Sequence, residues 1–321
     1  MKCRHRNLIL LVALLVAGAA RMPFEAALTG ELRAAGLLPP PLAIGTRDHI
    51  GQTSSAVALG GLRTLVATFL NLRAYTFFTE RRWDDVADTF DLIVDLAPRT
   101  GYYWETGAWH QAYNASSYYL NDSDLPPLRR NAAWRASVLR GRAFLERGIR
   151  NNPGDPRLNA YLGFLLTDRN KFKAFRDADA NFSAAAAAYK TAADAGGALP
   201  YLRRFQLYAL ARVPGREAEA LALARHLYQT RSNHTPTLQC VYFALEAHAN
   251  PKLIDPGSFA LSVFGSAGTA YETLSNYWLR TSDRLPVHGV AAALTALETQ
   301  LGIPADKSVF VRHPIPDTED E

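Results

Sequence analysis

Apolar side chains recur at helical spacing through residues 60–113. Two stripes are visible, the second more regular than the first. The first consists of Leu62, Leu65, Val66, Phe69 and Leu72, and the second of Trp83, Val86, Phe90, Ile93, Val94 and Ala97. The short break between them predicts two antiparallel helices whose stripes face each other. A third helix, starting near Gly101, should pack on this pair, because two helices alone cannot enclose a core.

The spacing of the second stripe recurs three times further along the chain. The matching sets are Val86, Phe90, Ile93 and Pro98; Gly141, Leu145, Gly148 and Pro153; Ala178, Phe182 and Ala185; and Ala224, Tyr228 and Pro236. This recurrence predicts successive helix pairs in which Phe90, Leu145, Phe182 and Tyr228 occupy equivalent positions between neighbouring pairs. Gly163, in the first helix of a later pair, should let its partner helix approach closely.

The helix pair over residues 67–100 resembles a tetratricopeptide repeat. The likeness is carried by Ala74, Phe77, Phe90 and Pro98. Leu70 departs from it, since an aromatic residue is usual at that place. The resemblance covers residues 62–236 and implies an all-α fold, a solenoid of antiparallel helix pairs with a groove lined by the first helix of each pair. It also implies a protein or peptide partner bound in that groove. The start Gly60-Gly61-Leu62-Arg63, together with Trp104, Trp109, Tyr113 and Asn114, is similar to a bacterial group of exported proteins with this repeat.

The composition changes at several points and suggests a domain organisation. Prolines at 39–41 favour an extended spacer. The polar run 114–130, which contains NDSDLPPLRR, indicates a turn-rich insertion in the repeats. After Pro236 the repeat match fades although helical periodicity persists, which suits a capping element. The expected parts are 1–21, a signal peptide or signal anchor; 22–59, a proline-containing tether; 60–236, the repeats; 237–308, a helical C-terminal cap; and 309–321, a tail with a short strand and an acidic end.

The N-terminus is typical of an export signal. Lys2, Arg4, His5 and Arg6 precede an uninterrupted apolar run over residues 8–20. That run is short for a membrane span, which needs about 20 residues. The segment is therefore a cleaved signal, an uncleaved anchor or, as the third alternative, a buried helix of the fold. The first two place the remaining chain in the periplasm, free or held at the periplasmic side of the inner membrane.

Charge and cysteine content narrow the function classes. The net charge of +5 comes from arginines scattered along helices, a pattern that argues against nucleic-acid binding. Cys3 and Cys240 are the two cysteines of the 321 residues, and they do not suggest a disulfide framework. With 48% hydrophobic residues, the chain can bury a sizeable core.

Motifs for catalysis, metals and cofactors are absent from the sequence. His226, His234 and His248 lack the spacing of metal ligands, and no phosphate-binding loop or nucleophile elbow occurs. An α-superhelical enzyme acting on cell-wall glycan would need an isolated catalytic glutamate, for which Glu272 and Glu298 are the candidates. We therefore expect a non-enzymatic binding scaffold without cofactor or metal. The glycan enzyme and a self-associating structural module are the alternatives.

The first helices of the repeats supply the expected partner-binding residues. Aromatic and arginine side chains dominate the binding energy of many interfaces. The candidates are Arg73, Tyr75, Tyr103, Trp104, His110, Arg203 and Arg204. Packing between helices is the competing interpretation for each of them, above all for Tyr103 and Trp104.

Overall fold

The computed structural model describes residues 2–35, 52–195, 199–252 and 255–315. Contacts divide the chain into two compact units, Met1–Leu59 and Gly60–Glu321. The prolines at 39–41 and the acidic end of the tail lie outside the described residues. All regular structure in the described ranges is helical, so the all-α prediction is confirmed.

The first unit contains α1 (Lys2–Ala34), a single helix that continues through Pro23. Within the described part of the chain, no helix combines the length and the apolar character that crossing a membrane requires. The export signal stays a prediction. The helix α2 (Gln52–Thr79) starts before the division between the units and ends in the second.

The second unit consists of helices joined by short connections. They are α3 (Trp83–Leu96), α4 (Gly101–Trp109), a π-helix (His110–Ala115), α5 (Ser116–Asn121), α6 (Pro127–Asn151), α7 (Pro156–Thr167), α8 (Ala178–Asp194), α9 (Tyr201–Leu210), α10 (Glu217–Tyr228), α11 (Pro236–Ala249), α12 (Pro256–Phe264), α13 (Ala267–Thr281) and α14 (Val290–Leu301). Val309–Val311 forms a turn of 3-10 helix, so the expectation of a short strand there is wrong.

Local sequence explains where many of these helices begin. The side-chain oxygens of Asp155, Asp177, Thr235, Asp255 and Ser266 accept hydrogen bonds from backbone N–H groups in the first turns of α7, α8, α11, α12 and α13. Proline occupies the first position of α7, α11 and α12, where its missing N–H costs nothing.

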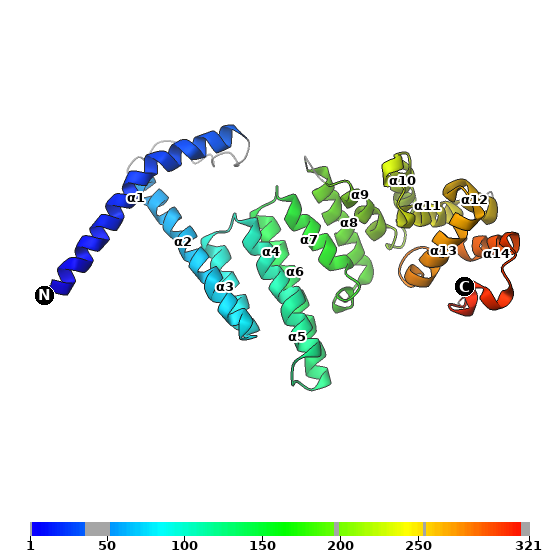
Figure 1. Ribbon diagram of the computed structural model, residues 1–321, viewed down its shortest axis with the longest axis horizontal. Helices are drawn as coiled ribbons and strands as arrows, with labels where there is room; N and C mark the ends of the chain where they lie inside the picture. Colours follow the sequence, from blue (N-terminus) through cyan, green and yellow to red (C-terminus); the bar gives the residue numbers. More distant parts are fainter. Residues whose placement is uncertain (1, 36–51, 196–198, 253–254, 316–321) are drawn as a thin grey trace. The chain divides into compact units, whose positions relative to one another are not determined.

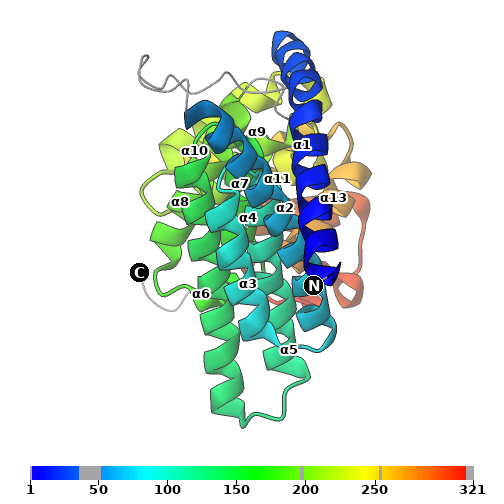
Figure 2. The same ribbon diagram turned by 90° about the vertical axis from the view of Figure 1, so that its left-hand side faces the viewer.

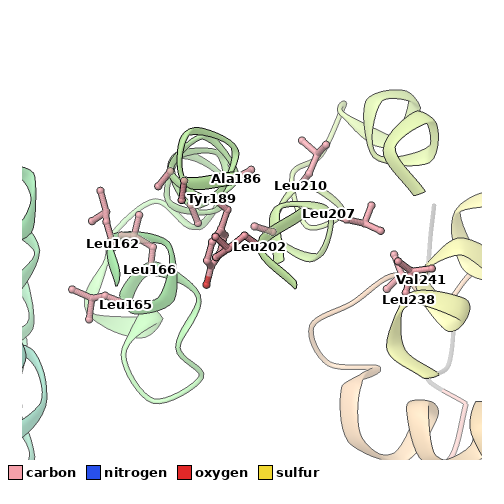
Figure 3. Close-up of a cluster of buried hydrophobic side chains, with 14 of the residues drawn as sticks. Leu162, Leu165, Leu166, Ala186, Tyr189, Leu202, Leu207, Leu210, Leu238 and Val241 are labelled. Atoms are coloured by element: carbon pink, nitrogen blue, oxygen red, sulfur yellow. The ribbon is translucent and has the colours of Figure 1, made fainter. Parts of the chain in front are cut away.

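Helices that follow one another along the chain pack together from α3 to α14 (Figures 1 and 2). The helix α4 also contacts α7, and α11 also contacts α13. In the core of α7, α8 and α9, the buried Tyr189 lies among Leu162, Leu166 and Leu202 (Figure 3). Leu207, on α9, points toward Leu238 and Val241 of α11, which continues the core into the next helix pair (Figure 3).

The four residues predicted to occupy equivalent repeat positions differ in burial and in the rings that they contact. Phe90, Leu145 and Phe182 are buried, and Tyr228 is half-buried. The Phe90 ring contacts His110, just beyond α4, and the Tyr228 ring stacks on Tyr242 of α11. Both therefore meet the next helix pair, as expected, whereas Phe182 contacts Phe172 within its own pair as well as Arg212 of the next.

The apolar stripe of α2 is not buried as the sequence suggests. Leu62, Leu65, Phe69 and Leu72 are each more than half exposed, and within residues 61–79 of α2 the buried positions are Ala67 and Ala74. At the C-terminal end of α2, the Phe78 ring contacts Trp83 and His110. The expectation that the stripe faces α3 is wrong, because small residues mark the packed side of this helix.

The polar run 114–130 is not a turn-rich loop. The chain stays helical through the π-helix and α5, and only residues 122–126 separate α5 from α6, which runs beside it (Figure 2). The polar side chains bond back onto the helix: Ser116 Oγ donates to Ala112 O at 2.5 Å, and Asn121 Nδ2 donates to Ser117 O at 3.0 Å. Such bonds let Ser and Asn continue a helix in which their side chains would otherwise compete for backbone groups.

Candidate functional site

Exposed aromatic side chains gather around one hollow in the second unit. Trp109, Phe164, Tyr201 and Phe205 are 36–45% exposed, although large aromatic residues are usually well buried. With Tyr161 and Tyr189 they line a cavity of ≈ 320 Å³, which we call the aromatic hollow. The side chains come from α4, α7, α8 and α9, so consecutive helix pairs line a single cavity.

Ring contacts hold these side chains in place. Trp109 stacks on Tyr113 with ring centroids 4.2 Å apart, and Tyr113 stacks in turn on Phe164 at 6.1 Å. Phe205 contacts Tyr189 at 5.6 Å and Tyr201 at 5.2 Å. Packed aromatic rings lose little conformational entropy when a ligand binds, which favours recognition by contact area.

A second cavity, of ≈ 500 Å³, shares Phe164, Tyr189 and Phe205 with the aromatic hollow. We call it the arginine hollow, because Arg169, Arg212 and Arg284 line it. The two cavities therefore form one continuous surface that is aromatic at one end and cationic at the other. Asp168 is the carboxylate among its lining residues.

Burial shapes the electrostatics of the arginine hollow. The guanidinium of Arg212 lies over the Phe182 ring, 3.6 Å from its centroid, and 5.3 Å from that of Phe172. Burial lowers the pKa of Arg212 to about 10, and the positive charge of Arg284 adds to this effect, while Asp283 opposes it.

A larger cavity, of ≈ 820 Å³, lies beside α6 and the start of α8, but three of its four charged side chains, all except Arg176, are already engaged. Arg135 Nε donates to Ala174 O at 2.9 Å, and Arg142 pairs with Glu146 at 2.8 Å. Asp177 Oδ1 accepts the first-turn N–H of Ala180 in α8. This cavity offers fewer free groups to a ligand than the two joined hollows.

A buried lysine and serine lie next to the π-helix. Lys171 Nζ donates to Ser116 Oγ at 2.7 Å, and burial lowers the pKa of Lys171, an effect that Asp168 opposes. Serine and lysine in contact can form a nucleophile and its base. Here Ser116 is fully buried and Lys171 is 7% exposed, so an external substrate cannot reach the hydroxyl. The pair ties the segment before α8 to the first residue of α5, directly after the π-helix that carries Tyr113.

None of the seven residues predicted to bind a partner lines the two hollows. Arg73 and Tyr75 lie exposed on α2, with the Arg73 guanidinium 5.3 Å from the Phe77 ring centroid. Tyr103 and Trp104 are buried, and Trp104 Nε1 donates to Pro98 O at 2.8 Å. Both are core residues in this structure.

The other three predicted residues have partners within the fold. His110 lies between the rings of Phe78 and Phe90, and burial lowers its pKa. Arg203 forms an ion pair with Asp194, and Arg204 donates to Asn233 Oδ1 at 2.9 Å. Four of the seven predicted residues lie on α4 and α9, two helices that also line the aromatic hollow, but at other positions; Arg73 and Tyr75 lie on α2 and His110 on the π-helix.

The residues considered for catalysis and metal binding do not form a reactive centre. Glu298 Oε1 accepts hydrogen bonds from Tyr271 Oη and Val309 N, both at 3.0 Å, and so joins α14 to α13 and the C-terminal turn. Glu272 is exposed. His234 stacks on Tyr228, and among the residues that the structure describes, no group of three or more His, Cys, Asp or Glu side chains could hold a metal ion.

His288, next to His248, is expected to make the stability of the second unit depend on pH. The rings of His248 and His288 lie with centroids 4.2 Å apart. Burial lowers the pKa of His288 below 6.5, the charge of His248 lowers it further, and Glu217 opposes both. Because the pKa is lower in the folded than in the unfolded state, the stabilisation is complete above pH 6.5 and is lost as the pH falls through the folded-state pKa.

We therefore expect the urea midpoint to fall between pH 7.5 and pH 5.0, and to fall less in His288→Asn. Comparing the two proteins at both pH values isolates this pair from His110, which contributes in the same direction. If the urea midpoint falls equally in the two proteins, the assignment to His288 is contradicted.

Taken together, the geometry supports recognition of a ligand by a continuous aromatic and cationic surface. The polar groups of this surface come from side chains of α7, α8, α9, α11 and α13 and from the turns that follow α7, α9 and α13. Comparisons of the chain with protein-family models, with curated proteins and with solved structures found no significant match.

Proposed function

We propose that the chain is a non-enzymatic scaffold of tetratricopeptide-like repeats, an α-solenoid that binds an extended segment of a partner protein. The observation that carries this proposal is the aromatic hollow, in which exposed rings from successive helix pairs converge. Aromatic side chains contribute most to many interfaces, because each removes a large apolar area from water at little entropic cost.

The width of this surface favours a peptide over a small molecule. It extends from Trp109 on α4 through Phe164 and Phe205 to Arg284 beyond α13. Side chains at several points of an extended segment could each meet a different helix. The basic and apolar N-terminal segment supports an exported protein, held at the periplasmic side of the inner membrane or released into the periplasm after cleavage.

Selection of displayed random peptides on the full-length protein tests this proposal. We expect enriched peptides to bind with Kd values that rise at least tenfold in Phe164→Ala and Phe205→Ala, because loss of a central aromatic contact typically costs more than about 1.4 kcal/mol. Leu92→Ala is the matched control, since Leu92 is an exposed apolar residue on α3, outside both hollows.

Binding should be unchanged in the control variant. Selection without enrichment, or enriched peptides whose affinity is the same for wild type and both phenylalanine variants, would overturn the proposal.

A further inference from the structure

Arg212 is a half-buried cation without an ionic partner. Among the described residues, none accepts a hydrogen bond or forms an ion pair with its guanidinium, which rests on the rings of Phe172 and Phe182. Buried charges in proteins are usually paired or hydrogen-bonded, because the loss of hydration is otherwise not offset. The side chain is therefore held by packing, with its donors unused, beside the arginine hollow.

Arg284 lies close enough for its charge to act on Arg212 and is incompletely bonded itself. Its Nε is buried without a hydrogen-bond partner, and the nearest carboxylate, that of Asp283, is 3.7 Å away and mostly exposed. A second Arg284 nitrogen donates to Arg280 O at 3.0 Å, which fixes the direction of the group. Two like charges near each other, both facing one cavity, favour an anion between them.

The rest of the arginine hollow limits which anion fits. Asp168 bonds to the backbone N–H of Asn170 at 2.8 Å, and its charge acts on Lys171 and Tyr113 instead of on Arg212. A phosphate group carries a charge of about −1.5 to −2 at neutral pH, so Asp168 would repel it more strongly than it repels a singly charged carboxylate. Arginine also matches the planar geometry of a carboxylate by donating two parallel hydrogen bonds.

We propose that the arginine hollow receives the carboxylate of a glutamate or aspartate in the bound peptide, between Arg212 and Arg284. The partner segment is then acidic at the end that lies toward α13 and aromatic or apolar at the end that lies in the aromatic hollow. This inference rests on the proposed function, because it names the charge of the segment held by the same surface.

Peptide selection on the wild type and on Arg212→Met and Arg284→Gln tests this inference. Methionine keeps an unbranched apolar stem over the Phe182 ring, and thermal unfolding of each variant shows that it is folded. On the wild type we expect enrichment of peptides with one acidic residue near an aromatic residue. On both variants we expect the acidic preference to disappear while the aromatic preference remains.

Single peptides then provide the quantitative measurement. Replacing the glutamate of an enriched peptide with glutamine should weaken binding to the wild type by about tenfold to a hundredfold, as expected for a charge-assisted hydrogen bond. The same replacement should have little effect on binding to either variant. Replacing the glutamate with phosphoserine should also weaken binding, because of Asp168.

The outcomes separate this inference from the proposed function. Enriched peptides without acidic residues, an acidic preference that survives both substitutions, or tighter binding of the phosphoserine peptide would overturn the carboxylate site and leave peptide binding in the aromatic hollow intact. A failure to enrich any peptide would overturn both.

Discussion

Replacing Gly141 with valine is expected to destabilise the second unit by about 3 kcal/mol or more, the upper end of the cost of overpacking a core. A Cβ atom at residue 141 would lie 2.6 Å from Ala112 Cβ, 2.9 Å from Ala112 N and 3.0 Å from Ala108 O. Two of these atoms belong to the backbone of α4 and the π-helix, so no rotamer change can relieve the contact. The helices must move apart, and urea unfolding followed by circular dichroism measures the cost.

Moving α4 and the π-helix away from α6 should also weaken peptide binding, because these helices carry Trp109 and Tyr113. Gly141→Ala, which adds the Cβ alone, should show a smaller loss of stability than valine. Gly268→Ala is the control: Gly268 lies in α13, and a methyl group added there would have nothing within 4 Å. At that position alanine should leave stability unchanged or raise it by up to about 1 kcal/mol. A Gly141→Val protein as stable as the wild type would show that α4 and α6 are not in this close contact.

Helices with one clear apolar face could be predicted with their packing. In α3, Trp83, Val86, Phe90 and Ile93 are all buried, as the stripe predicted. In α2 the same reasoning predicted a helix but chose the wrong face, and the helix begins at Gln52, within the predicted tether, instead of near Gly60. Apolar residues occur on several sides of α2, and periodicity does not tell which side a neighbour covers. The buried Ala67 and Ala74 carry small side chains, which a stripe of large apolar residues does not point to.

The helical course of the polar run 114–130 could not be read from composition. Its Ser, Asn and Pro residues are common in loops. In the structure Ser116 and Asn121 bond to carbonyl groups one turn earlier, and Pro127 begins α6 at a position that favours proline. Ser116, directly after the π-helix, also accepts a hydrogen bond from Lys171, which is distant in sequence. A pattern in one segment carries no information about such a partner.

The position of the candidate site depended on which aromatic side chains stay exposed. Trp104 and Trp109 are separated by five residues, which places them about 140° apart around a helix. Trp104 is 2% exposed and Trp109 is 41% exposed. One regularity could have identified the hollow: Trp109 and Phe164 each stand eight residues after the first residue of their helix, α4 and α7. Aligning the helix starts, in place of searching for the repeat motif, would have brought them together.

Trp104→Ala is expected to lower the free energy of unfolding by about 3–5 kcal/mol, the usual cost of removing a large aromatic side chain from a core. The Trp104 ring packs on Phe144, with centroids 5.0 Å apart, and covers Gly148, where a Cβ atom would lie 2.8 Å from Trp104 Cγ. Alanine would leave a cavity between α4 and α6 that neither helix can fill.

Trp104→Phe separates packing from hydrogen bonding in this prediction. It keeps most of the ring volume and loses the bond from Nε1 to Pro98 O, but Asn152 Nδ2 still donates to that oxygen at 2.9 Å. Trp104→Phe should therefore lower the free energy of unfolding much less than Trp104→Ala does. Tyr75→Ala, from the same set of predicted binding residues, should stay within about 0.5 kcal/mol of wild type, because Tyr75 is 67% exposed.

Urea unfolding measures the free energy of unfolding of Trp104→Ala, Trp104→Phe and Tyr75→Ala. Peptide affinity then shows whether Trp104 acts on stability or on binding. Because Trp104 lines neither hollow, the folded fraction of Trp104→Ala should bind peptide with an unchanged Kd. The variant should bind less peptide in total only because less of it is folded. A raised Kd in a variant that unfolds like the wild type would instead make Trp104 a binding residue, in conflict with its place between α4 and α6.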